Sequence, residues 1–254
     1  MLNSDDYYEL HQENLKFVEI ELSYVKKMVN NLAASYLWEQ DKKRDEKQLE
    51  KKEQELQAMT RLYAFLLGNW YEIRLYKIIS EKSKVAFSME EKKQIKDLKK
   101  ITQKWEKCFE ISMNKIDQET WNDLTRKNLE SNFGDYMQEI SNLITMRNRL
   151  GHGQWRVQMN GKQTSILTPD AIINYPDINK LVLLKNKMDL IAKIIEKIVI
   201  YKEKDKKSFS EQIESLMNEI SIVNQRINKS DLRKYVNSNL SKIKKNEERR
   251  NTKI

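Results

Sequence analysis

Residues 133–155 read FGDYMQEISNLITMRNRLGHGQW, and this stretch decides how we interpret the rest of the chain. Apolar residues recur in it at helical intervals, namely Phe133, Met137, Ile140 and Ile144. This spacing predicts an amphipathic helix with one face turned to a core. Gly151 is the residue type that closes a helix by adopting the left-handed conformation, so we expect the helix to end at about Leu150.

Arg147 and His152 flank that expected helix end. In an unbroken helix, residues five apart lie about 140° apart around the axis, so the two side chains would diverge. A turn at Gly151 can swing His152 back toward the face that Arg147 occupies. The result would be a permanent cation beside a residue type that titrates near neutrality, a pair suited to hold a phosphate and move a proton.

The composition predicts an all-α protein. The chain has 254 residues, 33% of them charged, with only five glycines and two prolines to interrupt helices. The net charge of +9 favours an anionic partner such as nucleic acid, although a lysine-rich solvated surface explains the charge equally well. One cysteine excludes an internal disulfide, and two histidines give no usual metal cluster, so we expect neither metal nor cofactor.

The apolar segments are too short for a membrane protein. None approaches the roughly 18 apolar residues needed to cross a bilayer, and the acidic start Asn3-Ser4-Asp5-Asp6 is unlike a secretory leader. We therefore expect a soluble cytoplasmic protein with no membrane partner.

Before the quoted stretch, apolar periodicity predicts four helices. The first covers about 5–38 and carries His11, for which a surface or capping role is expected. Residues 39–57 are nearly all polar and form either an exposed helix or a connector. A second helix covers 58–80, where Gly68 indicates a close helix approach. A third helix follows the capping box Ser88-Met89-Glu90-Glu91 and runs to about 116. A fourth begins near 119, and Gly134 can split it.

After the quoted stretch the period changes. Alternating apolar residues around Asn160-Gly161 predict a β-hairpin over 155–167, in which Trp155 either packs against Ile166 or stacks on a base. Asp177 is expected to cap a core helix that runs to about 204. We thus divide the chain into a helical bundle, 1–205, and a C-terminal helical extension with a basic tail, 206–254.

The segment Arg147-Asn148-Arg149-Leu150-Gly151-His152, on a helix and followed by an expected hairpin, resembles the motif of the HEPN superfamily. It is most similar to the "Arg-Asn…His-Gly" signature of HEPN proteins from bacterial toxin and antiphage defence systems. The resemblance implies a HEPN-like bundle and a metal-independent endoribonuclease. In such an enzyme the RNA 2′-hydroxyl attacks the adjacent phosphate, leaving a 2′,3′-cyclic phosphate and a 5′-hydroxyl.

The resemblance also implies roles for named residues. His152 would act as general acid or base and Arg147 would stabilise the pentavalent phosphate, with Asn148 and Glu72 in support. Arg149 and Trp155 are candidate RNA contacts. Because one histidine does not easily serve as both acid and base, the resemblance implies a homodimer in which two motifs converge, with an antitoxin or defence protein as a further possible partner.

Two alternatives remain open at this stage. The first is a non-catalytic HEPN-like module that binds a nucleotidyltransferase, an antitoxin, another protein or nucleic acid through its helices. The second is a structural coiled-coil or DNA-binding protein that uses the basic C-terminal region, in which case residues beyond Lys207 would be essential and Arg147 and His152 dispensable.

Overall fold

The computed structural model describes residues 4–42, 45–82, 86–152, 177–201 and 206–251. Within these ranges the chain forms eight α-helices and one 3₁₀ helix, η1 (Gln118–Thr120). The α-helices are α1 (Ser4–Asp41), α2 (Glu46–Ile79), α3 (Met89–Lys96), α4 (Ile101–Asn114), α5 (Asp123–Gly151), α6 (Ile178–Val199), α7 (Lys206–Asn228) and α8 (Leu232–Asn251). No strand occurs in the described residues, so the predicted all-α class is confirmed for them. The β-hairpin predicted at 155–167 lies outside the described residues.

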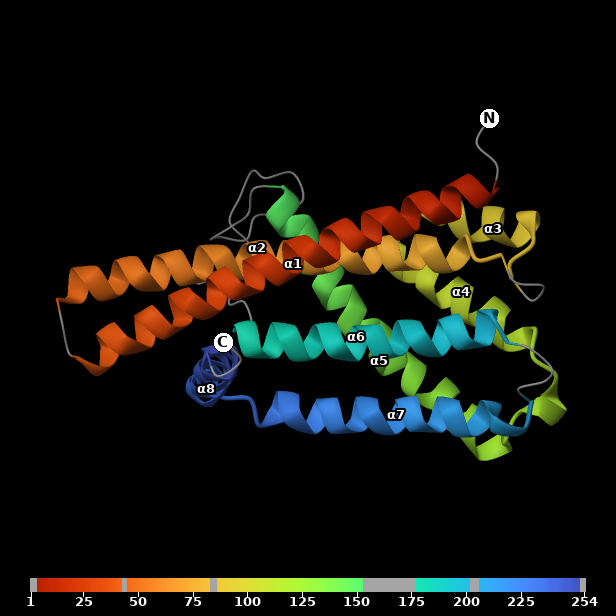
Figure 1. The fold of residues 1–254 in the computed structure, drawn as a ribbon. Helices are drawn as coiled ribbons and strands as arrows, with labels where there is room; N and C mark the ends of the chain where they lie inside the picture. The colour runs from red at the N-terminus through yellow and green to blue at the C-terminus, as the bar shows by residue number, and fades with distance from the viewer. Residues whose placement is uncertain (1–3, 43–44, 83–85, 153–176, 202–205, 252–254) are drawn as a thin grey trace.

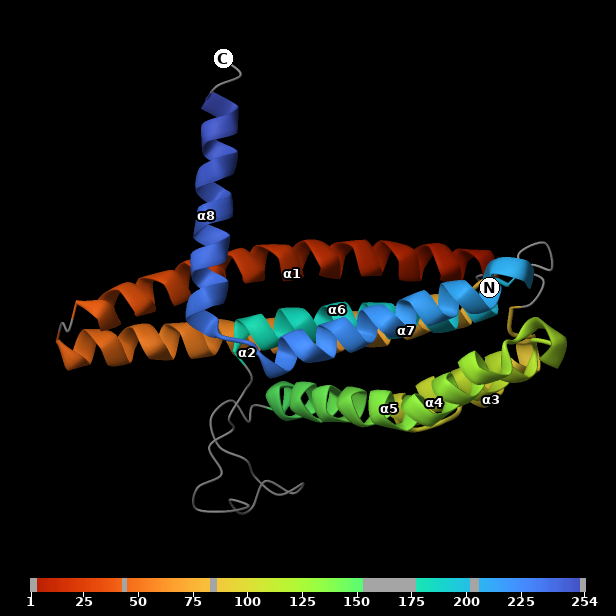
Figure 2. The ribbon, with the colours of Figure 1, turned by 90° about the horizontal axis from the view of Figure 1, so that it is seen from below.

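The helices pack in layers around α2. The two longest helices, α1 and α2, form an antiparallel hairpin, and α6 and α7 form a second one beside it (Figure 1). Seen from below, α1 lies on one side of α2, α6 and α7, whereas α3, α4 and α5 lie on the other (Figure 2). The last helix, α8, crosses the end of the body and extends beyond α1.

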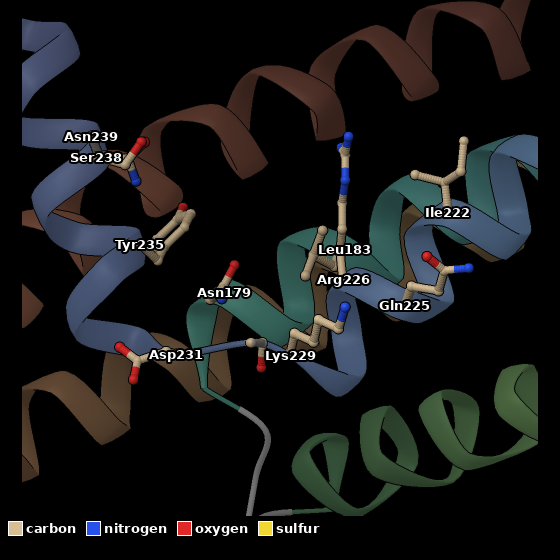
Figure 3. A pocket seen from close by; sticks show the side chains of 11 residues that line it. Asn179, Leu183, Ile222, Gln225, Arg226, Lys229, Asp231, Tyr235, Ser238 and Asn239 are labelled. Carbon is tan, nitrogen blue, oxygen red and sulfur yellow. The ribbon is translucent and has the colours of Figure 1, made fainter.

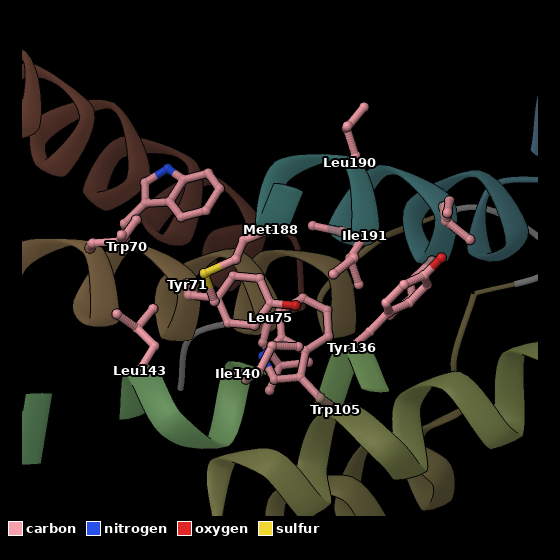
Figure 4. Close-up of a cluster of buried hydrophobic side chains, with 14 of the residues drawn as sticks. Trp70, Tyr71, Leu75, Trp105, Tyr136, Ile140, Leu143, Met188, Leu190 and Ile191 are labelled. Carbon is pink, nitrogen blue, oxygen red and sulfur yellow. The ribbon is translucent and has the colours of Figure 1, made fainter. Parts of the chain in front are cut away.

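Large aromatic side chains fill the space between α2, α4, α5 and α6 (Figure 4). Tyr71 stacks on Trp105 with ring centroids 4.4 Å apart, and both side chains are fully buried. Trp70 is equally buried, and its indole Nε1 donates a hydrogen bond to Glu19 Oε1 over 3.1 Å. Truncating such a ring to alanine typically costs about 3–5 kcal/mol, so this cluster fixes how α2 and α5 cross.

The polar stretch predicted as an exposed helix or a connector is helical for most of its length. Helix α2 begins at Glu46, where the Asp45 carboxylate accepts a hydrogen bond from Lys47 N over 3.1 Å. Its first turns are held by side-chain pairs such as Lys52 with Glu55, 3.0 Å apart. The second helix therefore starts twelve residues earlier than the apolar pattern predicted, because exposed turns carry no apolar signal.

Two further helix boundaries differ from the sequence prediction. The single third helix is wrong, since the chain breaks between α3 and α4 at residues 97–100. In a continuous helix Ile95 and Ile101 would lie about 120° apart, and the break allows both to be buried. The split at Gly134 is also wrong, because α5 runs unbroken through it. Buried side chains on both sides of this glycine, including Leu129 and Met137, hold the helix in place.

The helix caps predicted at Ser88 and Asp177 are confirmed. Ser88 and Glu91 form a reciprocal capping box, and Asp177 accepts from Lys180 N over 3.0 Å. Asp231 caps α8 in the same way and accepts from Lys234 N over 2.8 Å. Beyond residue 205, α7 adds buried side chains to the same core as the earlier helices. Phe209 packs edge-on against Trp121, with centroids 4.9 Å apart. The first helix of the C-terminal extension is thus integral to the packing of the bundle.

Candidate functional site

Arg147 lies where α5 crosses α2 at unusually close range. A Cβ atom added to Gly68 would lie 2.6 Å from Arg147 Cβ and 2.8 Å from its Cγ. No side chain other than hydrogen fits at position 68 without a shift of the neighbouring helix. The close approach predicted from Gly68 is therefore confirmed, and its partner is the arginine of the motif.

Glu72 lies one turn beyond Gly68 on the same face of α2 and forms an ion pair with Arg147. The Arg147 side chain is 23% exposed and that of Glu72 is 31% exposed, so solvent still reaches both. The carboxylate takes one edge of the guanidinium group, while Arg147 Nε is buried and has no hydrogen-bond partner among the described residues. Glu72 thus holds the guanidinium in a fixed direction without fully enclosing it.

A cleft of about 500 Å³ opens beside this ion pair, between α2, α5 and the start of α4. Helix α5 contributes Ser141, Ile144, Thr145, Arg147 and Asn148 to its wall, and α2 contributes Glu72 and Tyr76. The remaining wall is formed by Lys99, Lys100, Ile101, Thr102 and Lys104. The charged lining consists of four cations and one carboxylate, which makes the cleft strongly basic.

The three lysines are functional candidates that the sequence analysis missed. Lys104 Nζ donates a hydrogen bond to the Tyr76 hydroxyl over 3.1 Å, and neither Lys99 nor Lys100 forms an ion pair within the described part of the chain. Lys100 also occupies the N-cap of α4 without a side-chain cap, so the free amides of the first turn add positive potential near the cleft. The sequence analysis predicted one continuous helix from the capping box to about 116, which gave no reason to single out these lysines.

His152 lies apart from Arg147 within one chain. Helix α5 continues through Gly151, and His152 is its exposed C-cap residue with φ −93° and ψ 17°. Its backbone N–H donates to Asn148 O over 3.0 Å, as in a continuing helix. The left-handed turn predicted at Gly151 is therefore wrong, and His152 points about 140° around the axis from Arg147. His152 does not line the cleft.

The remaining predicted site residues divide between the cleft and its surroundings. Asn148 is exposed and lines the cleft next to Arg147. Arg149 is half-buried in the last turn of α5, where a cation interacts favourably with the helix dipole. Trp155 lies outside the described residues.

The other histidine, His11, packs behind the cleft. Its ring stacks on Tyr76, a cleft residue, with ring centroids 5.6 Å apart and an interplanar angle of 19°. Burial lowers the pKa of His11, and the nearby charge of Lys96 lowers it further. His11 is thus a packing partner of the cleft wall rather than the surface or capping residue expected from the sequence.

A second cleft, of about 430 Å³, lies between α6, α7 and α8 (Figure 3). Its charges are nearly balanced, with Arg226 and Lys229 near Asp231, and its wall includes the apolar side chains of Leu183 and Ile222. Tyr235 enters it from α8, and burial is the main cause that raises the pKa of this phenol. The second cleft lacks the cation surplus of the first, so we place the candidate site at Arg147.

No family model, no curated protein and no solved structure matches this chain. Among the described residues, no group of three or more histidine, cysteine, aspartate or glutamate side chains could hold a metal ion. None of the described helices combines the length and apolar character needed to cross a membrane.

Proposed function

We propose that this protein is a metal-independent endoribonuclease of the HEPN type that acts as a toxin or antiphage effector. The observation that carries the proposal is the setting of Arg147. Its guanidinium group is fixed by Glu72 and by the tight crossing at Gly68, and it faces a cleft whose other cations lack carboxylate partners among the described residues. A phosphodiester supplies the negative charge that this arrangement leaves unbalanced.

Each site residue has a separate role in the reaction. A base takes the proton of the RNA 2′-hydroxyl, whose oxygen attacks the adjacent phosphorus and forms a pentavalent phosphorane. Arg147 neutralises the charge that develops on its equatorial oxygens. The bond to the 5′-oxygen then breaks, an acid protonates the leaving oxygen, and the products carry a 2′,3′-cyclic phosphate and a 5′-hydroxyl. His152 is the general acid or base, and Asn148 orients the RNA at the edge of the cleft.

The proposal requires two copies of the chain. Arg147 and His152 point in different directions from α5, and one imidazole does not serve as acid and base in the same step. A two-fold arrangement of two α5 helices brings four groups together, one arginine and one histidine from each copy. The active unit is therefore a homodimer whose site is incomplete in either chain alone.

Cleavage of a defined substrate tests the proposal. The substrate is an RNA-containing oligonucleotide, and the measured product is its 2′,3′-cyclic phosphate end, in the presence of EDTA. We expect His152→Ala to lower the rate about 10²–10⁴-fold and Arg147→Ala about 10²–10³-fold. Arg126→Ala is the matched control, because it removes another arginine of α5, one that pairs with Glu130 and does not line the cleft. Equal cleavage by wild type and His152→Ala would refute the ribonuclease assignment.

Growth provides the corresponding test in cells. Expression of the wild-type chain in bacteria is expected to arrest growth and degrade tRNA or mRNA, and His152→Ala is expected to do neither. An unchanged arrest with His152→Ala would separate toxicity from the proposed chemistry.

The different directions of Arg147 and His152 on α5 favour one alternative, a HEPN-like module that binds nucleic acid or a protein without cleaving it. The basic cleft suffices for binding, because phosphate contacts need cations and no titrating group. This alternative predicts that the wild type binds RNA, that Lys100→Gln weakens the binding, and that no cyclic phosphate appears at any enzyme concentration.

A further inference from the structure

Helix α1 exposes a row of large apolar side chains to solvent. Leu10 is 43% exposed, Phe17 68%, Ile20 51%, Tyr24 67% and Met28 51%. Single apolar residues on a surface are ordinary, but five on one face of a helix, interrupted only by Glu13 between Leu10 and Phe17, are not. We call these five residues the outer stripe.

The outer stripe lies opposite the side of α1 that packs on the body. At 100° per residue, its five members fall within an arc of about 80°. The residues Leu15, Val18, Leu22, Val25 and Val29 form the buried seam, whose centre lies on the other side of the helix. Figure 2 shows α2 and α6 on one side of α1, and α8 contacts the C-terminal end of α1 and projects to the other side. Helix α1 thus has two apolar faces, and among the described residues only one of them is covered.

The charges are divided along the part of α1 that carries the outer stripe. Between Tyr7 and Glu21 there are four glutamates and one lysine, whereas between Leu22 and Trp38 there are two lysines and no acid, and acids return only at the end of α1 with Glu39 and Asp41. Glu13 and Glu21 are exposed in the first half, and Lys27 is exposed in the second. Two such helices placed side by side in opposite directions bring each acidic half against a basic half.

We propose that the outer stripe packs against the outer stripe of a second copy of this chain, with the two α1 helices antiparallel and the two-fold axis near Ile20. Such a contact is self-complementary, as an isologous interface must be. From Leu10 to Met28 the stripe extends about 27 Å, which is long enough for five turns of helix–helix packing. Because a standard interface buries about 800 Å² per partner and one helix pair supplies less, we expect association at micromolar concentration.

The charge pattern distinguishes a second copy from a membrane surface. A helix that lies on a bilayer carries basic residues along its polar face, whereas glutamates flank the first half of the outer stripe. The same stripe also differs from the proposed catalytic interface, because α1 and α5 lie on opposite sides of α2 (Figure 2). The α1 contact therefore adds an interface and does not itself assemble the Arg147 and His152 site.

Molecular mass in solution tests this interface. We expect the purified chain at tens of micromolar to have at least the mass of a dimer by light scattering, and the double variant Phe17→Glu, Tyr24→Glu to have half the wild-type mass. Both side chains are mostly exposed, so circular dichroism and melting should be unchanged. Gln48→Glu at the exposed start of α2 is the control, because it adds negative charge away from the outer stripe and should keep the wild-type mass. A monomeric wild type, or a double variant of wild-type mass, would overturn the proposal.

Cysteine cross-linking tests the antiparallel direction. Ile20→Cys near the axis should form a disulfide-linked dimer, whereas Leu10→Cys alone should not, and a mixture of Leu10→Cys with Met28→Cys should cross-link. The native thiol does not interfere, because Cys108 is fully buried and burial raises its pKa. Efficient dimerisation of Leu10→Cys alone would contradict the antiparallel arrangement. The stripe would instead be assigned to a lipid surface by two results together. The wild type would be monomeric in solution, and it would bind phosphatidylglycerol vesicles while the Phe17→Glu, Tyr24→Glu variant would not.

Whether this interface exists does not depend on the ribonuclease proposal. Arg147→Ala should abolish cleavage and keep the α1 cross-link, whereas the Phe17→Glu, Tyr24→Glu variant should lose the cross-link formed by Ile20→Cys in the same chain. A wild-type chain that forms the α1 cross-link but does not cleave RNA would refute the ribonuclease proposal alone. Cleavage of RNA by a chain that does not form the cross-link would refute the α1 interface alone.

Discussion

The two charged sides of α2 are organised in opposite ways. Toward α6, Arg74 Nη2 lies 2.9 Å from Glu196 Oε2 and Lys77 Nζ lies 2.8 Å from Glu196 Oε1, with Asp189 a further 3.8 Å partner of Arg74. Toward α5, the only carboxylate that lines the cleft among the described residues is Glu72, against Arg147 and three lysines. The first side satisfies its cations within the protein, and the second leaves a surplus.

The difference separates a structural cluster from a candidate binding site. Cations that are enclosed and paired fix the packing of two helices, because their desolvation must be compensated locally. Cations at an open cleft that lack carboxylate partners among the described residues remain available to an anion from outside. Helix α2 therefore serves as a scaffold on its α6 side and helps to form a candidate site on its α5 side.

The largest expected effect comes from removing the carboxylate of the paired side. Glu196→Ala leaves Arg74 and Lys77, whose side chains are 11% and 12% exposed, without their main counter-charge. We expect the free energy of unfolding to fall by about 2–3 kcal/mol, as measured by urea denaturation. The matched variant Glu72→Ala should cost less than about 1 kcal/mol, because water reaches Arg147 through the cleft. Equal losses for the two variants would remove the distinction between the two sides of α2.

The next largest effect concerns the close crossing of α5 and α2 beside the cleft. Gly68→Ala places a methyl group against Arg147, and we expect a loss of about 1–3 kcal/mol with displacement of the guanidinium group. Gly134→Ala is the control in the same layer, since nothing lies within 4 Å of the added atom. It should stabilise the protein by about 0.5–1 kcal/mol through helix propensity. Stabilisation by both substitutions would show that the crossing is not tight.

These two glycines show what the sequence could and could not reveal. Helix periodicity, the caps at Ser88, Asp177 and Asp231, and the all-α class follow from residues close in the chain, so they were predictable. Gly68 and Gly134 look alike locally, because only the position of α5 makes one of them crowded. The ion pair of Glu72 with Arg147 joins residues 75 apart, and its expectation came from a family resemblance rather than from spacing.

The basic cleft could not be predicted from local sequence patterns, for the same reason. Lys99 and Lys100 reach the cleft because the chain breaks between α3 and α4, and the break depends on burying both Ile95 and Ile101. The direction of His152 depends on whether Gly151 continues the helix, which the choice of glycine leaves open. Local patterns thus located the motif, whereas tertiary packing determined which groups surround it.

RNA binding tests the cation surplus of the cleft directly, and the expected change in free energy is smaller than in the two preceding predictions. The double variant Lys99→Gln, Lys100→Gln should weaken binding of single-stranded RNA about tenfold at moderate salt, while stability changes by less than about 0.5 kcal/mol. The slope of log K against log salt should fall in magnitude by about 1.4, since each phosphate contact on a single strand contributes about 0.7. Lys47→Gln, Lys51→Gln on the exposed start of α2 removes the same charge as a control and should leave the slope close to that of the wild type. Equal slopes for the two double variants would show that the cleft does not hold RNA phosphates.

The smallest effect is a pH dependence confined to the paired side. Burial acts to lower the pKa of Lys77, but the hydrogen bond and charge of Glu196 outweigh it, so the pKa is raised above 10.5. A raised pKa in the folded state stabilises the protein fully below pH 10.5, and this contribution is lost as pH rises through the folded pKa. The stability difference between wild type and Lys77→Met should therefore be constant near pH 8 and shrink above pH 10.5 in urea titrations.

In a Glu196→Gln background the same comparison should lose most of its pH dependence, because the group that raises the pKa is gone. The effect stays small because Arg74 remains charged at every pH tested and continues to neutralise Glu196. A pH dependence that survives in the Glu196→Gln background would mean that the charges between α2 and α6 are not coupled in the way the geometry indicates.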